Sequence, residues 1–315
     1  MTRATERFVP VPADFACYET DVRWAARVLD TGPDHLETLA ANGFPHADDP
    51  ERGPLFDHVD LMNLAMYGAG NGQTIPDLAI RFLLRFADAD PRTWYEPREW
   101  RVRVRPPKHA PAGLTAQEYR ISRPDVTAPG IQAIRPAVAD GVGFEVVVRI
   151  TGAPASIQDR QIWDVYAELV DALNTGTVVY QAVPERLRMR HATAWELGMA
   201  DCVVTSRLLA ERLRAAGHTA RARRGYLLGL VGSDHAWCEV YEDGAWKPVD
   251  VVFASLAGTQ RFDASASFVA ACGGGRFNRL LPCQADDAVA LVAIDDEPAP
   301  PWALAGVSCQ PWSAG

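Results

Sequence analysis

Two apolar runs separated by an Asp-Gly pair constrain the fold of this chain more than any other stretch. Residues 234–242 and 245–253 are rich in Val, Tyr, Trp and Phe. Asp243-Gly244 between them is a dipeptide preferred in two-residue hairpin turns. The pattern predicts two antiparallel strands in which Glu242 pairs with Ala245.

This register decides which side chains of the hairpin share a face. It sets His235 opposite Val252 and Trp237 opposite Asp250, and all four project from one face because side chains alternate with period two. His235 and Asp250 are then diagonal neighbours, close enough for an imidazole and a carboxylate to meet. A four-residue loop would keep this register, and a three-residue loop with a bulge would break it. Cys238 falls on the opposite face.

A helix is predicted from Asp201 to Ala216, and Cys202 stands at its start. Asp201 is a good N-cap residue, and Gly217 follows where a C-terminal cap belongs. The apolar residues that recur at helical spacing are Val204, Leu208, Leu209, Leu213 and Ala216.

Cys202 has two interpretations. In the first turn of a helix, free backbone N–H groups and the helix dipole favour an anion, and the thiolate is the nucleophilic form of cysteine. Cysteine is also a common buried residue that only packs. Together, Cys202, His235 and Asp250 supply a nucleophile, an imidazole to take its proton and a carboxylate to fix the tautomer, as covalent acyl transfer requires. Spacing leaves open whether Cys202 meets His235 in space.

Five stretches between roughly residues 155 and 255 resemble the core of the transglutaminase-like superfamily in order, spacing and residue type. They are Glu196–Cys202, Leu209–Arg221, Arg224–Tyr226, His235–Tyr241 and Gly244–Asp250. The resemblance implies an α+β, papain-like core in which a helix N-terminus carries the nucleophile and packs on an antiparallel sheet.

The same resemblance implies a role for each of three residues. Cys202 would be the nucleophile, His235 the general base and then acid, and Asp250 the residue that orients His235. Two positions depart from the family pattern. Ala200 stands where a glycine commonly precedes the Asp-Cys pair, and Val251 stands where a proline commonly follows the aspartate. Neither change removes a reactive group.

Composition excludes several classes of protein. The formal net charge of −9 argues against general nucleic-acid binding, which needs a basic surface. No targeting segment and no run of 18 apolar residues is visible, so we expect a cytoplasmic protein without a membrane partner. The six cysteines show no metal-ligand spacing, and we expect reduced thiols with no metal and no cofactor.

The chain divides into three predicted parts, namely an N-terminal helical then β-rich accessory region (1–152), a catalytic domain (153–297) and a Pro-rich, non-helical C-terminal arm (298–315). Helices are predicted at 13–30, 34–42, 55–67, 75–87, 159–173 and 261–270. Strands are predicted at 99–105, 118–122, 144–150 and 288–294. Dense proline and glycine predict irregular connections between 106 and 141.

The first of these strands carries a row of arginines. Trp100, Val102 and Val104 alternate with Arg101, Arg103 and Arg105, which is typical of a strand with one wet face. The row is interpreted as a solvated surface, and the alternative is a docking site for an acidic partner.

Three more residues are candidates for substrate binding. Trp163 could line the entrance to Cys202, and Trp237 shares a face with His235. An oxyanion donor besides the Cys202 backbone N–H is expected, and Gln181 and Trp163 are the candidates for it. The alternative for Trp163 is a place in the core.

A Cys-His-Asp site forms a thioester with an acyl donor and passes the acyl group to water or to an amine. The superfamily that this chain resembles contains protein crosslinkers, peptidases, peptide-N-glycan hydrolases and amide-forming acyltransferases of natural-product biosynthesis. The expected cytoplasmic location, the lack of an anchor or calcium site and the single core with an N-terminal elaboration favour the last group. A composition rich in Ala, Arg and Asp fits a GC-rich bacterial source.

The hypothesis is therefore a cysteine-dependent acyltransferase, with an acyl-thioester donor, carried by a carrier protein or a small molecule, and an amine acceptor. The alternatives are a cysteine peptidase or amidase, and a non-catalytic binding module that keeps the fold as a scaffold.

Overall fold

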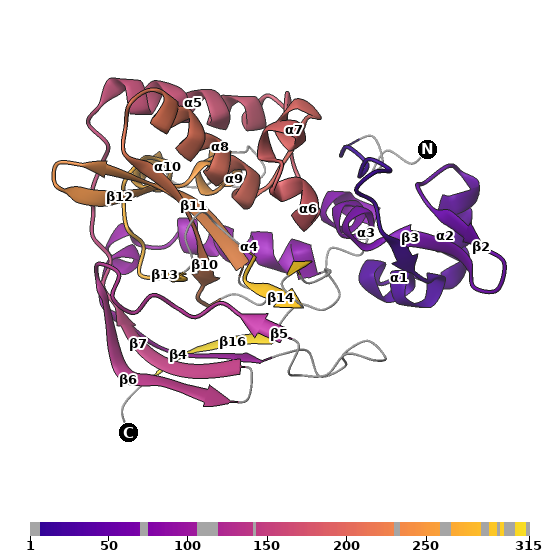
Figure 1. Cartoon of the computed structure of the whole chain (residues 1–315), viewed down its shortest axis with the longest axis horizontal. Helices are drawn as coiled ribbons and strands as arrows, with labels where there is room; N and C mark the ends of the chain where they lie inside the picture. The colour runs from indigo at the N-terminus through magenta and orange to yellow at the C-terminus, as the bar shows by residue number, and fades with distance from the viewer. Residues whose placement is uncertain are drawn as a thin grey trace.

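The computed structural model has a mixed α+β architecture, as expected (Figure 1). It describes residues 7–69, 75–105, 119–140, 143–229, 234–258, 266–284, 290–294, 297–298 and 306–312. A larger body holds two main β-sheets and most of the helices. A smaller unit formed by residues 7–69, which we call the N-terminal unit, lies beside it (Figure 1).

The predicted hairpin lies in the central sheet of the larger body, in the predicted register. Glu242 pairs with Ala245 and Cys238 pairs with Val249. The sheet is antiparallel, with the order β12-β11-β10-β13. Its strands are β12 (Ala245–Val249), β11 (Asp234–Glu242), β10 (Ala220–Leu227) and β13 (Leu280–Pro282).

The second strand of the hairpin is shorter than predicted. β12 ends at Val249, and helix α9 (Val251–Gly258) begins where the sequence pattern predicted strand up to residue 253. The Asp250 side chain explains the change, since its Oδ1 accepts a hydrogen bond from the Phe253 N–H at 2.9 Å and so caps the new helix. The ladder pairs predicted for Asp250 and Val252 therefore do not form.

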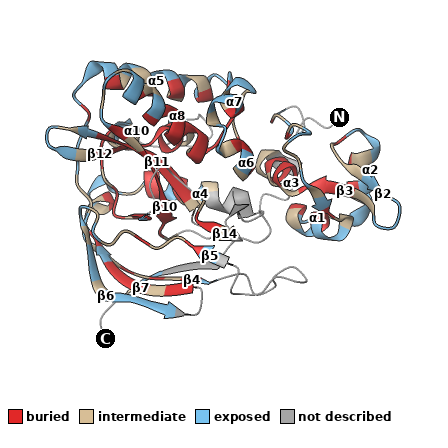
Figure 2. Ribbon diagram, viewed as in Figure 1, coloured by how far each residue is buried: buried red, intermediate tan, exposed pale blue. Residues whose placement is uncertain are grey.

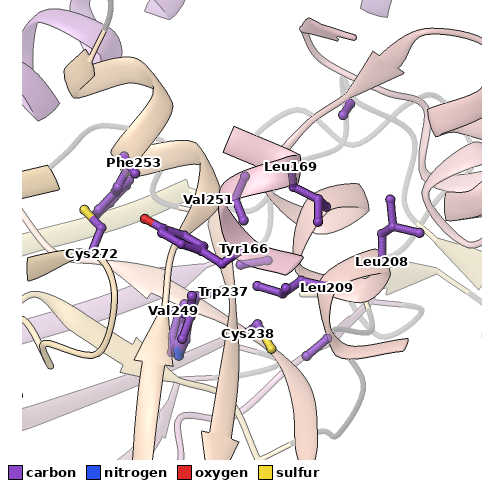
Figure 3. Close-up of a cluster of buried hydrophobic side chains, with 14 of the residues drawn as sticks. Tyr166, Leu169, Leu208, Leu209, Trp237, Cys238, Val249, Val251, Phe253 and Cys272 are labelled. Atoms are coloured by element: carbon purple, nitrogen blue, oxygen red, sulfur yellow. The ribbon is translucent and has the colours of Figure 1, made fainter. Parts of the chain in front are cut away.

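Helices α5 (Arg160–Asn174) and α8 (Cys202–Ala215) lie close to their predicted positions and pack with α9 and the central sheet around one apolar core. Figure 2 shows that α8, β10 and β11 are largely buried. Figure 3 shows part of this core, which includes Tyr166 and Leu169 of α5, Leu209 of α8 and Trp237 of β11.

A second antiparallel sheet has the order β16-β4-β7-β6. Its strands are β16 (Gly306–Pro311), β4 (Arg98–Arg105), β7 (Gly143–Ile150) and β6 (Ile131–Asp140). The irregular connection predicted for 106–141 is wrong over β6. This strand contains Pro136 and two register shifts and lies at the sheet edge, where proline is tolerated, so proline density was a poor guide there.

The arginine row lies on β4 as the alternation predicted. Trp100, Val102 and Val104 are buried, whereas Arg101 and Arg103 are partly exposed. The Arg103 Nε donates to Glu145 of β7 at 2.6 Å, so at least part of the row forms ion pairs across the sheet.

The N-terminal unit has its own small core, with Leu29, Leu36 and Phe56 completely buried. It comprises β1 (Tyr18–Thr20), α1 (Val22–Leu29), α2 (Pro33–Ala41), β2 (Ala47–Asp49), β3 (Gly53–Asp57), α3 (His58–Leu64) and the π-helical turn Ala65–Ala69. Two predicted helices begin too early. The first half of the helix predicted at 13–30 is wrong, and so are the first three residues of the helix predicted at 55–67, because Tyr18–Thr20 and Gly53–Asp57 pair as strands. Helix propensity there is overridden by pairing between segments distant in sequence.

The remaining elements follow the predictions where the structure describes them. Helix α4 (Ile75–Ala87), strand β5 (Tyr119–Ile121) and strand β14 (Val292–Ile294) match, and α10 (Ala266–Ala271) falls within the end of the helix predicted at 261–270. Residues 259–265 and 285–289 lie outside the described residues. None of the helices in the described parts of the chain has the length and apolar character needed to cross a bilayer.

Candidate active site

Cys202 is the first residue of α8, as the sequence predicted. The Asp201 carboxylate caps the helix, because its Oδ1 accepts hydrogen bonds from the N–H groups of Val203 and Val204, both at 3.0 Å. Cys202 is partly exposed, whereas the residues around it in α8 are buried.

The Cys202 backbone N–H is left free by this cap. Asp201 satisfies the next two N–H groups, and no acceptor for the Cys202 N–H lies among the residues that the structure describes. A free N–H at the positive end of a helix can stabilise an oxyanion formed next to the thiol.

His235 and Asp250 meet as a hydrogen-bonded pair. The His235 Nε2 lies 2.6 Å from the Asp250 Oδ2, and both side chains are buried, with residue exposures of 4% and 3%. Because Oδ1 of Asp250 caps α9, this one carboxylate also fixes the start of a helix. The imidazole stacks on Phe253 of the same helix, with ring centroids 4.2 Å apart.

The hydrogen bond through Nε2 leaves Nδ1 of His235 available to a second partner, and Cys202 lies close enough to contribute to the pKa of this imidazole. Burial by itself lowers the pKa of His235, but the Asp250 carboxylate and, to a smaller extent, a hydrogen bond from Cys202 raise this pKa to about 10. The structure thus brings together the three residues that spacing could not join. A protonated His235 beside Cys202 favours the thiolate.

A network of five buried or partly buried charges links the cysteine helix to the histidine strand. It consists of Glu185, Arg188, Asp201, Arg224 and Asp234. Arg188 of helix α6 (Glu185–Arg188) donates to Asp201 at 2.6 Å, and Arg224 donates to Asp234, the neighbour of His235, at 2.8 Å. Glu185 accepts from both arginines, at 2.8 Å and 2.6 Å, and they hold its pKa at about 2 although burial alone would raise it. The network ties the Asp201 cap to the start of β11.

The sequence pattern did not identify this network. Arg224 is one of three arginines on β10, and Arg188 lies in a short helix without a recognisable motif. Only burial distinguishes them from surface arginines.

The three candidate substrate-binding residues have their side-chain donors engaged elsewhere. The Trp163 indole N–H donates to the Ile157 carbonyl at 2.7 Å, and the Gln181 amide donates to the Val9 carbonyl at 2.7 Å. The Trp237 indole N–H lies 3.3 Å from a Glu239 carboxylate oxygen, although its ring lies beside that of His235, with centroids 6.1 Å apart. The free Cys202 N–H is thus the oxyanion donor that the described geometry supports.

Tyr180 is a further residue near the cysteine, and the sequence pattern did not indicate it. It belongs to strand β8 (Val179–Tyr180), which pairs in parallel with β9 (Met199–Ala200), two residues before Cys202. Burial raises the pKa of Tyr180 well above its usual value, and its proximity to Cys202 and Asp201 adds to the rise.

The other described cysteine side chains are poor nucleophiles. Cys238, Cys272 and Cys283 are buried, and burial raises the pKa of each. Cys17 is exposed, but partial burial and the neighbouring Glu19 raise its pKa to about 11. Cys202 alone combines access with an imidazole partner among the described cysteine side chains.

Limiting iodoacetamide near pH 6 is expected to alkylate Cys202 selectively, because this thiol is accessible at a helix N-terminus and lies beside His235, whereas the other described cysteine side chains lack such a partner. Intact mass and peptide mapping of wild type and His235→Ala measure the effect. The variant should lose the selectivity, and Cys17 is the internal control because its thiol is accessible but protonated. Equal labelling of Cys17 and Cys202 in the wild type would contradict the assignment.

No group of three or more His, Cys, Asp or Glu side chains suited to a metal ion occurs among the described residues. A comparison with protein families matches residues 158–251 to the family described as the transglutaminase-like superfamily. No curated protein matches the chain.

Two solved structures are similar in part. One is a candidate cysteine protease from Cytophaga hutchinsonii, with 11% identity and a TM-score of 0.39 over 70% of this chain and 92% of that chain. The other is described as a TGase, with 14% identity and a TM-score of 0.26 over 48% of this chain and 51% of that chain. Neither score is high enough to transfer an activity. The family match contains Cys202, His235 and Asp250, and residues 158–251 of this chain form a transglutaminase-like superfamily domain.

Proposed function

We propose that this protein is a cysteine-dependent acyltransferase that forms an amide bond through an acyl-thioester intermediate on Cys202. The observation that carries the proposal is the buried His235–Asp250 pair beside a cysteine at a helix N-terminus. This arrangement supplies a nucleophile, a proton carrier and an orienting carboxylate in one place.

In the first half-reaction, the Cys202 thiolate attacks the carbonyl carbon of an acyl-thioester donor. A new C–S bond forms, and the negative charge on the carbonyl oxygen is stabilised by the free Cys202 N–H. The bond to the leaving thiol then breaks, and the proton on His235 passes to that thiol. The acyl group is now a thioester of Cys202, and His235 is neutral.

In the second half-reaction, an amine attacks the thioester while His235 Nδ1 takes its proton. The C–N bond forms, the C–S bond to Cys202 breaks, and the thiolate and protonated His235 are restored. Asp250 holds the imidazole by Nε2 throughout, so Nδ1 remains directed at the reacting atoms.

The burial of the proton carrier supports transfer to an amine over hydrolysis. His235 and Asp250 are exposed by only 4% and 3%, so little water reaches the imidazole that would have to activate it, whereas the partly exposed Cys202 is accessible to an acyl donor and an amine. We infer a donor that is itself a thioester, on a carrier protein or a small molecule, and a role in bacterial natural-product biosynthesis.

A short acyl N-acetylcysteamine thioester with a primary amine provides the test. Product mass spectra are expected to show an amide whose ratio to free acid rises with amine concentration, because the amine and water compete for one intermediate. Cys202→Ala is the matched control and should give neither product. Free acid alone at every amine concentration would indicate an amidase or peptidase. Full biological activity in Cys202→Ala would indicate a binding module.

A further inference from the structure

The strand pair β8–β9 ends just before the cysteine helix and is held by few hydrogen bonds within the larger body. β8 and β9 pair over only two residues each, Val179 with Met199 and Tyr180 with Ala200. The flanking hydrogen bond runs from the Gln181 N–H to the Ala200 carbonyl at 2.8 Å, and Asp201-Cys202 follow at once. A parallel pair this short is not stable by itself.

The N-terminal unit supplies the missing support through Asn63 of α3. The Asn63 Oδ1 accepts from the Ala182 N–H at 2.7 Å, and the Asn63 Nδ2 donates to the Ala182 carbonyl at 3.0 Å. Asn63 is completely buried. Its amide therefore pairs with the backbone of residue 182 as a neighbouring strand would.

Gln181 makes the reciprocal contact, in which a side chain of the larger body binds the backbone of the N-terminal unit. Its Oε1 accepts from the Val9 N–H at 2.9 Å, and its Nε2 donates to the Val9 carbonyl at 2.7 Å. The Tyr67 hydroxyl donates to the Tyr180 carbonyl. Three consecutive residues, 180 to 182, are thus bound to the N-terminal unit on one side, while Tyr180 and Gln181 are also bound to β9 on the other.

We propose that Asn63 and Gln181 are positioning residues for Cys202, because they hold the segment Tyr180–Ala182 that sets where Asp201 and Cys202 begin α8 relative to His235. The proposal rests on the proposed function insofar as Cys202 is the nucleophile. On this proposal the N-terminal unit helps to position the nucleophile, although none of its residues reacts with the substrate. A displacement of about 1 Å between reacting groups can cost roughly a hundredfold in rate.

The test is the pH profile of Cys202 alkylation by iodoacetamide, followed by peptide mapping. Asn63→Leu keeps the branched shape of the side chain but removes both hydrogen bonds to Ala182. The expected result is at least about a tenfold slower alkylation of Cys202 near pH 6 and a profile moved to higher pH, because the thiol and His235 separate. An unchanged rate and profile in a folded Asn63→Leu protein overturns the proposal.

Asp21→Ala is the matched control in the same unit. Asp21 caps α1 by accepting from the Trp24 N–H at 2.8 Å, and none of the hydrogen bonds found among the described residues joins it to β8, so its loss should weaken the unit without moving the strand. This variant should keep the wild-type profile, and a shift equal to that of Asn63→Leu would show that general destabilisation suffices. If Asn63→Leu does not fold, Asn63→Asp carries the same test, since it keeps the acceptor for the Ala182 N–H and loses the donor.

Alkylation needs no acyl donor, so the two proposals fail in different ways. A wild-type protein without selective labelling of Cys202 contradicts the proposed function. A selectively labelled wild type with an unaffected Asn63 variant contradicts only the positioning role. Gln181→Glu, which keeps the acceptor for the Val9 N–H and loses the donor to the Val9 carbonyl, should shift the profile in the same direction as the Asn63 variant.

Discussion

Replacing Cys202 with alanine is expected to abolish the acyl-enzyme and to lower kcat by about a million-fold, the loss typical of removing one member of a catalytic unit. The sulfur is the atom that bonds to the acyl group, and no other described cysteine side chain is both accessible and beside an imidazole. Trapping with a thioester donor, followed by intact mass measurement, detects the adduct directly.

His235→Ala should lose a comparable amount, because without the imidazole neither the thiolate nor the protonated leaving thiol is supported. Cys17→Ser is the control, since that exposed thiol lies in the N-terminal unit and outside the site. A trapped adduct on Cys17, or a His235→Ala variant with the wild-type rate, would show that the reactive centre lies elsewhere.

Asp250→Asn is expected to lower kcat by about ten-thousand-fold, less than the loss of the nucleophile. Asp250 uses one oxygen for His235 and the other for the Phe253 N–H. Asparagine has one acceptor oxygen, so keeping the helix cap turns its NH2 group toward Nε2 of His235. The imidazole must then carry its proton on Nδ1, where it cannot accept one from Cys202 or from the amine.

The same substitution should change the dependence of stability on pH. The folded-state pKa of His235 is raised from 6.5 to about 10, so the ion pair contributes its full stability below pH 6.5 and loses it as the pH rises through about 10. The difference in free energy of unfolding between wild type and Asp250→Asn should be larger near pH 6 than near pH 10. Urea unfolding at both values measures it, and a difference independent of pH would contradict the pair.

Patterns of residues close in the sequence were sufficient to predict part of this structure. The Asp-Gly turn and the alternating residues predicted the register of β11 and β12, and the Asp201 cap with helical spacing predicted where α8 begins. Both features depend on residues that are neighbours in the chain. The same reasoning was wrong for the first half of the helix predicted at 13–30 and for the first three residues of the helix predicted at 55–67, where pairing of β1 with β3 overrides local preference.

The sequence by itself therefore determined the identity and local placement of Cys202, His235 and Asp250. It also determined their resemblance to the family that the match over residues 158–251 confirmed. Only the tertiary structure decided that Asp250 leaves the strand to cap α9, and that Arg188 and Arg224 join the charge network. It also decided that Asn63 holds Ala182, 119 residues away in the chain. These contacts join segments distant in sequence, and a buried polar group can be satisfied by many partners, so no local pattern specifies which one it meets.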